Sequence, residues 1–135
     1  MRPFFLFFVL PIISARKQYA NVKGTLYCEG DTVENAKVEL WEHDIFTPND
    51  LLNSVTTDIL GEFEVRGSDN EYMDIAPYLV IRHFCNARPN CPRETTINIL
   101  PSENKDEVIS LSQIDLTFLR LDENDSCFKN RTSKA

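Results

Sequence analysis

The sequence predicts an all-β fold, a two-sheet antiparallel β-sandwich of about seven strands. Apolar residues alternate with polar ones over short segments, which is the side-chain period of a strand with one buried face. Gly, Pro, Asn and Asp residues that favour turns separate these segments. No segment has apolar residues at the spacing of a long amphipathic helix. Short strands with turns between them are typical of sandwiches.

Four strands are expected in the first half of the domain. In the first, over residues 22–28, Val22, Leu26 and Cys28 lie in phase with Gly24, and a turn at residues 29–31 follows. The next three are expected over residues 36–43, 51–57 and 62–66, with turns at 44–50, 58–61 and 67–70 between and after them.

Three more strands are expected in the second half. Residues 78–85 and 93–100 are predicted to form a hairpin, because Pro89 and Pro92 mark a break between two segments of high β-propensity. The last strand is predicted to carry Ile114, Leu116 and Phe118 on its core side.

The first fifteen residues predict a secretory signal peptide. Arg2 supplies the positive start, residues 4–13 the apolar stretch, and Ser14 with Ala15 the small residues before a cut at Arg16. The alternative, a membrane anchor, is disfavoured because a bilayer needs about 20 apolar residues. We therefore expect a secreted, extracellular protein with a signal peptide over 1–15, one domain over 16–121 and a polar tail over 122–135.

The net charge of −7 and the absence of any basic run argue against nucleic acid as a partner. Anionic lipid is a poor partner for the same reason. No segment after the leader approaches the length of a transmembrane helix.

Four cysteines, Cys28, Cys85, Cys91 and Cys127, follow the leader, and in an oxidising compartment an even number predicts two disulfides. A zinc site is disfavoured because no CxxC pair is present. Of the three connectivities, we favour one that includes Cys85–Cys91, which the predicted hairpin would bring together.

The order and spacing of several segments resemble those of the nematode transthyretin-like proteins, over nearly all of residues 22–121. The segments that carry the resemblance are residues 22–28 (VKGTLYC), 35–42 (NAKVELWE), 57–58 with 61–63, 77–86 (PYLVIRHFCN), 91–93 (CPR) and 97–101 (INILP).

This resemblance implies a transthyretin-like, or prealbumin-like, sandwich that is secreted and noncatalytic, and some members of the family look like extracellular ligands or bridging molecules at cell surfaces. It also implies that the first and last strands lie side by side and parallel. On that basis the second disulfide is predicted to be Cys28–Cys127, with the tail returning to the end of the first strand.

We predict no enzymatic activity, no cofactor and no metal. Hydroxyisourate hydrolase shares the transthyretin-like fold but uses two His, an Arg and a C-terminal Tyr-Arg-Gly-Ser, whereas this chain ends in residues 132–135 (TSKA) and has no His in its first strand. His83 is in phase with the core and is expected to be hydrogen-bonded and neutral, while His43 is expected in a solvated turn. The acidic residues of the loops are expected to be scattered and solvated rather than to bind calcium. They are Asp44, Asp50, Asp58, Asp69 and Glu71.

A candidate binding surface follows from the alternation of the hairpin strand. If Leu79, Ile81 and His83 point inward, their neighbours point outward, and Trp41 and His43 of the neighbouring strand share that side. The predicted surface consists of Trp41, Tyr78, Val80, Arg82 and Phe84. The alternatives are that loops or the tail cover these rings, or that a bulge turns Trp41 into the core.

The sequence therefore predicts an extracellular binding or signalling module that recognises an extracellular or cell-surface protein. The alternatives are a carrier of a small molecule or lipid, and a hydroxyisourate hydrolase-like enzyme, which the missing histidines disfavour. Homo-oligomerisation is compatible with either binding role. Sequons at Asn124 and Asn130 predict glycosylation of the tail.

Overall fold

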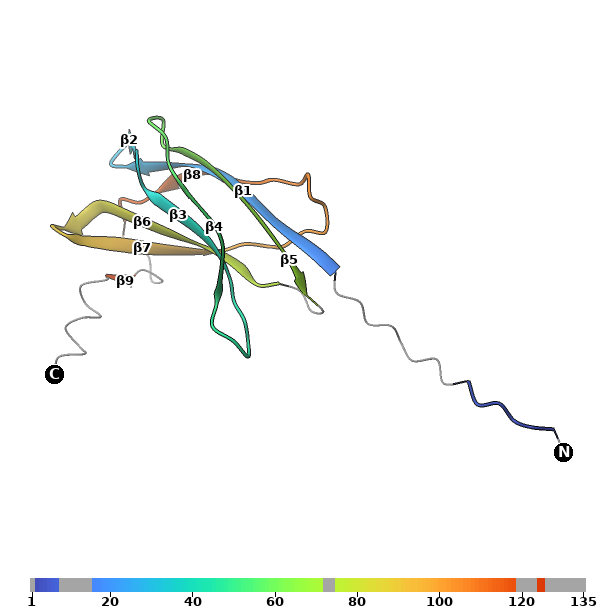
Figure 1. The fold of residues 1–135 in the computed structure, drawn as a ribbon. Helices are drawn as coiled ribbons and strands as arrows, with labels where there is room; N and C mark the ends of the chain where they lie inside the picture. The colour runs from blue at the N-terminus through green and yellow to red at the C-terminus, as the bar shows by residue number, and fades with distance from the viewer. Residues whose placement is uncertain (1, 8–15, 72–74, 119–123, 126–135) are drawn as a thin grey trace, which may run out of the picture.

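A computed structural model gives the fold, and it describes residues 2–7, 16–71, 75–118 and 124–125. These residues form nine strands and no helix, arranged in two sheets that pack face to face (Figure 1). The predicted all-β sandwich is confirmed. The strands are β1 (Arg16–Cys28), β2 (Asp31–Thr32), β3 (Lys37–Glu42), β4 (Asp50–Thr56), β5 (Glu62–Glu71), β6 (Pro77–Arg88), β7 (Cys91–Asn98), β8 (Ile109–Asp115) and β9 (Asn124–Asp125).

The first sheet, sheet A, has β1 between β5 and β8, with β2 as a short hairpin extension of β1. The second, sheet B, has the order β4-β3-β6-β7-β9. All neighbouring strands are antiparallel except β1 and β8, which run parallel. The parallel arrangement expected for the first and last strands of the domain is therefore present.

The core lies between the two sheets and consists of the inward residues of both. Val22, Leu26 and Val65 from sheet A are fully buried, as are Leu40 and Ile81 from sheet B. Burial of one such side chain stabilises the fold by about 1.5–3 kcal/mol. The alternation of apolar and polar residues in the sequence predicted the inward direction of these side chains, because successive side chains of a strand point to opposite faces of the sheet.

The edge strands β4 and β5 close one side of the sandwich. Gly67 allows this approach, because a Cβ atom there would lie 2.7 Å from Leu40 Cδ2 and 3.0 Å from Leu52 Cβ. The Asn53 side chain also donates a hydrogen bond to the Arg66 carbonyl at 2.8 Å. The contact between β4 and β5 therefore covers the core on this side of the molecule.

Three strands differ clearly in extent from the prediction. β5 continues to Glu71, so the turn predicted at residues 67–70 was wrong. β1 begins at Arg16 rather than Val22, because residues 67–71 of β5 pair with it. The last core strand ends at Asp115, and Phe118 is 72% exposed. The prediction that Phe118 lies on the core side was wrong, because the strand ends three residues before Phe118.

The predicted disulfide pairing was also wrong. Cys28 at the end of β1 is bonded to Cys85 in β6, and their Cα atoms are 5.7 Å apart. Cys85 is 6% exposed and faces sheet A, while in the β6–β7 hairpin Cys91 pairs with Arg88 instead. The disulfide therefore joins the two sheets and does not close the hairpin. Cys91 is disulfide-bonded as well, and Cys127 lies outside the described residues.

Candidate functional site

The outer face of sheet B carries the five residues predicted as a binding surface. Register places Trp41 opposite Tyr78 and Lys37 opposite Arg82, while Leu79 and Ile81 on the other face are fully buried. The predicted directions of these side chains are therefore correct. They form a row that runs along β6 toward Phe84.

Trp41 stays on the outer face despite a bulge. The β3–β4 register shifts between Leu40 and Trp41, which is the kind of irregularity that could have turned the ring inward. The side chain is half-buried but does not join the buried core, and its Nε1 is buried with no hydrogen-bond partner among the described residues. Trp41 is thus partly a packing residue of this face.

The middle of the face is an ion-pair network. Glu39 is only 4% exposed, and its carboxylate lies 3.1 Å from Arg82 Nη2 and 3.8 Å from Lys37 Nζ. Arg82 Nε lies 3.5 Å from Glu94 Oε1 on β7. Val80 beside this network is 9% exposed. Val80 is therefore nearly buried, and Arg82 is held along the sheet by its ion pairs, so neither side chain protrudes from the face.

Phe84 is the most accessible member of the row. Its side chain is 66% exposed, beyond the last residue pair that joins β6 to β3. A groove of about 530 Å³ lies beside it, and the Cys28–Cys85 disulfide, Val33 and Pro92 are among its lining residues. An exposed aromatic ring next to an apolar groove is a common feature of protein-binding surfaces.

Tyr78 connects the opposite end of the row to the β3–β4 loop. Its hydroxyl accepts a hydrogen bond from Asn49 Nδ2 at 2.8 Å. Asn49 Oδ1 in turn accepts from the Asp44 backbone N–H at 3.2 Å. The loop is therefore anchored to the outer face of sheet B, next to the exposed His43.

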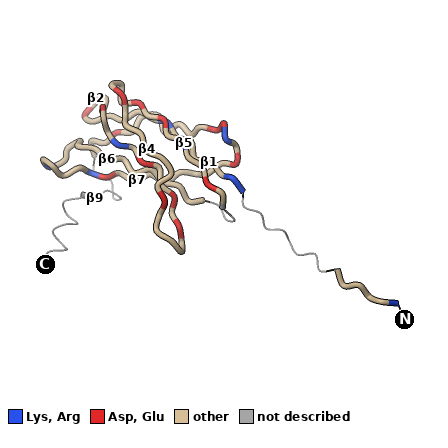
Figure 2. The backbone as a smooth tube through the Cα atoms, viewed as in Figure 1, with Lys and Arg blue, Asp and Glu red and all other residues tan. Residues whose placement is uncertain are grey.

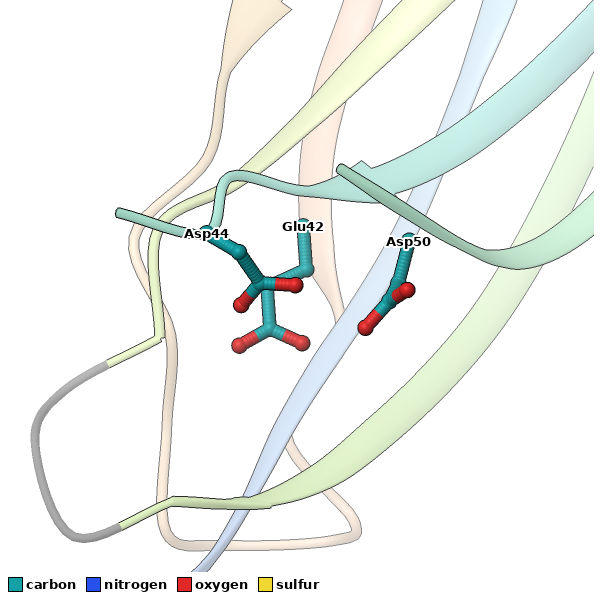
Figure 3. Close-up of side chains that lie close together, drawn as sticks. All are labelled: Glu42, Asp44 and Asp50. Atoms are coloured by element: carbon teal, nitrogen blue, oxygen red, sulfur yellow. The ribbon is translucent and has the colours of Figure 1, made fainter. Parts of the chain in front are cut away.

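Three carboxylates gather at the base of this loop. Glu42, Asp44 and Asp50 come from the end of β3 and the start of β4, and their nearest oxygens lie within 4.8 Å of one another (Figure 3). Asp44 raises the pKa of Asp50 above its ordinary 3.8, first through a side-chain hydrogen bond and then through like-charge repulsion. The expectation of scattered carboxylates was wrong for Asp44 and Asp50, because the hairpin pairs Glu42 with Asp50.

The carboxylate oxygens of this cluster suit a hard cation, although calcium normally takes six to eight oxygen ligands.

Asp58, in contrast, is a turn residue, since its carboxylate accepts hydrogen bonds from the Leu60 and Glu62 backbone N–H groups. Its role is structural.

His83 is a core residue, as predicted. It is 1% exposed, its Nδ1 accepts a hydrogen bond from the Cys85 backbone N–H, and its Nε2 lies 3.2 Å from Thr95 Oγ1. This geometry fits the neutral ring with hydrogen on Nε2. His43 directly follows β3, and its backbone N–H donates a hydrogen bond to the carbonyl of Ala76, which precedes β6. Because His83 lies seven residues after Ala76 along β6, the two histidines are about 20 Å apart.

Sequence reasoning missed Arg93. It is 5% exposed and donates to the carbonyls of Cys85 at 2.6 Å, Leu116 at 3.0 Å and Phe118 at 3.2 Å. The guanidinium thus ties β6 to the segment that follows β8. The sequence could have indicated this role, because Arg93 is two residues from Thr95 and therefore on the same, inward face of the strand. An Arg side chain that faces the core needs hydrogen-bond acceptors there.

The tail is described only at β9, which pairs with Arg93 and Glu94 of β7 and contains the backbone of Asn124. Asn130 lies outside the described residues. No helix within the described segments has the length and hydrophobicity needed to cross a bilayer.

Comparison with known proteins agrees with the two-sheet topology. The model of the Transthyretin-like family matches residues 23–100, more than half of the chain. The chain belongs to the Transthyretin-like family.

Two relatives in this family come from Caenorhabditis elegans. Transthyretin-like protein 16 is 46% identical over 81 residues, which cover 59% of this chain and 61% of that protein. Transthyretin-like protein 1 is 30% identical over 132 residues, which cover 87% of this chain and 85% of that protein. The chain thus spans about three fifths of the length of the first relative.

Among solved structures, a 9R-lipoxygenase from Cyanothece aligns with 87% of this chain and 19% of its own, at 21% identity and a TM-score of 0.42. The alignment is too weak to bear on the activity of this member of the Transthyretin-like family.

Proposed function

We propose that the protein is a secreted, noncatalytic binding module of the Transthyretin-like family that recognises an extracellular or cell-surface protein through the outer face of sheet B. The observation that carries this proposal is Phe84, which is 66% exposed at the end of an aligned row with Tyr78 and Trp41. Aromatic residues of this kind are enriched at the centres of protein interfaces.

The layout of the face supports a protein ligand. Its central charges are paired within the domain through Glu39, Arg82 and Glu94, so a partner would not have to desolvate isolated charges. Apolar contact with the partner would come from Phe84 and the adjoining groove at one end of the row, and from the accessible edge of the half-buried Trp41 ring at the other end.

A noncatalytic role is supported by the separation of the two histidines. His43 and His83 occupy opposite ends of sheet B, and His83 is committed to Cys85 and Thr95 in the core. General acid–base chemistry would need such groups within hydrogen-bond reach of one substrate.

Cell binding tests the proposal. Biotinylated secreted protein should bind live nematode cells saturably, and protease treatment of the cells should abolish the signal. Phe84→Ser should weaken binding at least about tenfold. Leu100→Ser is the matched control, because Leu100 is 81% exposed but lies off the row. Absence of saturable, protease-sensitive binding, or equal binding by Phe84→Ser, would refute the proposal.

A further inference from the structure

The β3–β4 loop ends in an exposed apolar tip. Ile45 is 72% exposed, and Phe46, at 95%, is more exposed than any other large apolar side chain described within residues 16–118. The loop projects from the body of the sandwich below β4 (Figure 1). Two adjacent large apolar residues at a projecting tip are costly for solubility, and such exposure commonly marks an interaction site.

The base of this loop is held in place. Glu42 pairs with Asp50 across the hairpin, and the His43 backbone N–H donates to the Ala76 carbonyl at 3.0 Å. Asn49 links Asp44 to the Tyr78 hydroxyl. A tip presented on a fixed base loses less conformational entropy when it binds.

Negative charge flanks the tip on both arms of the loop (Figure 2). Asp44 precedes Ile45, and Asp50 begins β4, with their carboxylates drawn together beside Glu42 (Figure 3). Among the described residues, no Lys or Arg nitrogen lies within 4 Å of either Asp44 or Asp50. A side-chain hydrogen bond with Asp44, and then repulsion between the two carboxylates, hold the pKa of Asp50 above its ordinary value. A basic group from outside the domain would relieve this repulsion.

We propose that Ile45 and Phe46 insert into an apolar pocket of the protein partner, and that Lys or Arg residues on the rim of that pocket meet Asp44 and Asp50. This inference rests on the proposed function and adds a second contact beside the Tyr78 end of the outer face. Charge complementarity around an apolar anchor is the usual way in which an interface combines affinity with orientation.

A protein fits this loop better than a membrane does. Two apolar side chains supply little area for anchoring in a bilayer, and stable interfacial binding usually adds cationic residues that attract anionic headgroups. Here the residues beside the tip are acidic and the whole chain has a net charge of −7. Anionic lipid would therefore be repelled at close range.

The first test removes the tip. Ile45→Ser with Phe46→Ser should reduce binding of the secreted protein to nematode cells at least about tenfold. The matched control is Ile59→Ser with Leu60→Ser, because these residues are 72% and 59% exposed on the loop at the opposite end of β4. Circular dichroism checks that both double variants are folded. Equal binding by the tip variant and the control would overturn the inference.

The second test removes the flanking charge. Asp44→Asn with Asp50→Asn should weaken binding several-fold at about 50 mM NaCl, and the difference from wild type should shrink at about 300 mM because salt screens the attraction. Tighter binding by this variant, or a difference that does not depend on salt, would contradict a basic rim.

The third test separates protein from membrane. The secreted protein should not sediment with vesicles of phosphatidylcholine, nor with mixed phosphatidylcholine–phosphatidylglycerol vesicles. Vesicle binding that is lost with the tip variant would assign the tip to lipid and overturn the inference. If wild type shows no saturable cell binding, the proposed function itself fails. If Phe84→Ser loses binding but the tip variant does not, only the inference fails.

Discussion

Cys28 and Cys85 join the last residue of β1 in sheet A to the inward face of β6 in sheet B, with their Cα atoms 5.7 Å apart. On the neighbouring strand, the Arg93 guanidinium donates to the Cys85 carbonyl at 2.6 Å and to the carbonyl of Leu116, which follows β8 of sheet A, at 3.0 Å. The two sheets are therefore linked at one end both covalently and by a buried cation. Phe84, the exposed residue of the proposed surface, immediately precedes Cys85 and is positioned by this link.

Removal of the disulfide should destabilise the domain substantially. Cys28 and Cys85 are 57 residues apart in sequence, and the chain-entropy estimate for a loop of that length is about 4 kcal/mol. Cys28→Ser with Cys85→Ser should lower the free energy of unfolding in urea by about this amount. Nonreducing peptide mapping should link Cys28 to Cys85, which leaves Cys91 and Cys127 as the second pair. A Cys28–Cys127 link would contradict this arrangement.

Arg93→Met should also be strongly destabilising. It leaves the buried carbonyls of Cys85 and Leu116 without their cationic donor, and loss of such contacts typically costs about 2–4 kcal/mol. Arg66→Met is the control, because the Arg66–Glu64 ion pair is about half exposed and should contribute less than about 1 kcal/mol. Urea denaturation measures both. Similar losses for the two variants would contradict a clamp at Arg93.

The sequence predicted which side chains of a strand point inward better than it predicted which residues of different strands meet. The inward directions of Leu79, Ile81 and His83 follow from the period of two, which depends only on local geometry. The Cys28–Cys85 pairing depends on which residues of two sheets face each other across the core, and no local pattern encodes that. The hairpin argument failed because the β6–β7 pairing extends to Arg88.

The candidate site shows the same division. The outward row was predictable from alternation, but the burial of Val80 and the ion pairs of Glu39 come from neighbours on three strands. Likewise, Asp44 and Asp50 are brought together by the return of the hairpin, and their separation in sequence gave no indication of this. Contacts between strands depend on register, which bulges such as that at Trp41 shift.

Trp41 and Phe84 should behave differently when truncated. Trp41 is half-buried with a buried Nε1, so Trp41→Ala should lower the free energy of unfolding by about 2 kcal/mol. Phe84 is 66% exposed, so Phe84→Ala should change it by less than about 0.5 kcal/mol. Thermal and urea unfolding give the comparison. A steep loss of stability for Phe84→Ala would mean that the ring is packed and is not an accessible contact.

Neutralising Asp50 should stabilise the domain at neutral pH. Because Asp44 raises the pKa of Asp50 above 3.8 in the folded state, folded protein holds this proton more tightly than unfolded protein does. Stability is therefore lost as pH rises from 3.8 through the folded pKa, and is unaffected below 3.8. Asp50→Asn should raise the melting temperature at pH 7 and leave it unchanged near pH 3. Asp31→Asn, at an exposed position in β2 away from the cluster, is the control.

The mature protein is predicted to begin at Arg16. Arg16 pairs with Glu71 across β1 and β5, and its Nη1 lies 2.7 Å from Glu103 Oε1. A cut after Ala20 would instead remove two buried residues, since Gln18 is 2% and Ala20 is 0% exposed, and Gln18 Oε1 accepts the Ile75 backbone N–H at 3.1 Å. Such a cut would leave that N–H unsatisfied and open the core, at a cost of about 1–3 kcal/mol for the lost hydrogen bond alone. N-terminal sequencing of secreted protein should therefore return Arg16, and a sequence that starts at Asn21 or Met1 would refute the prediction.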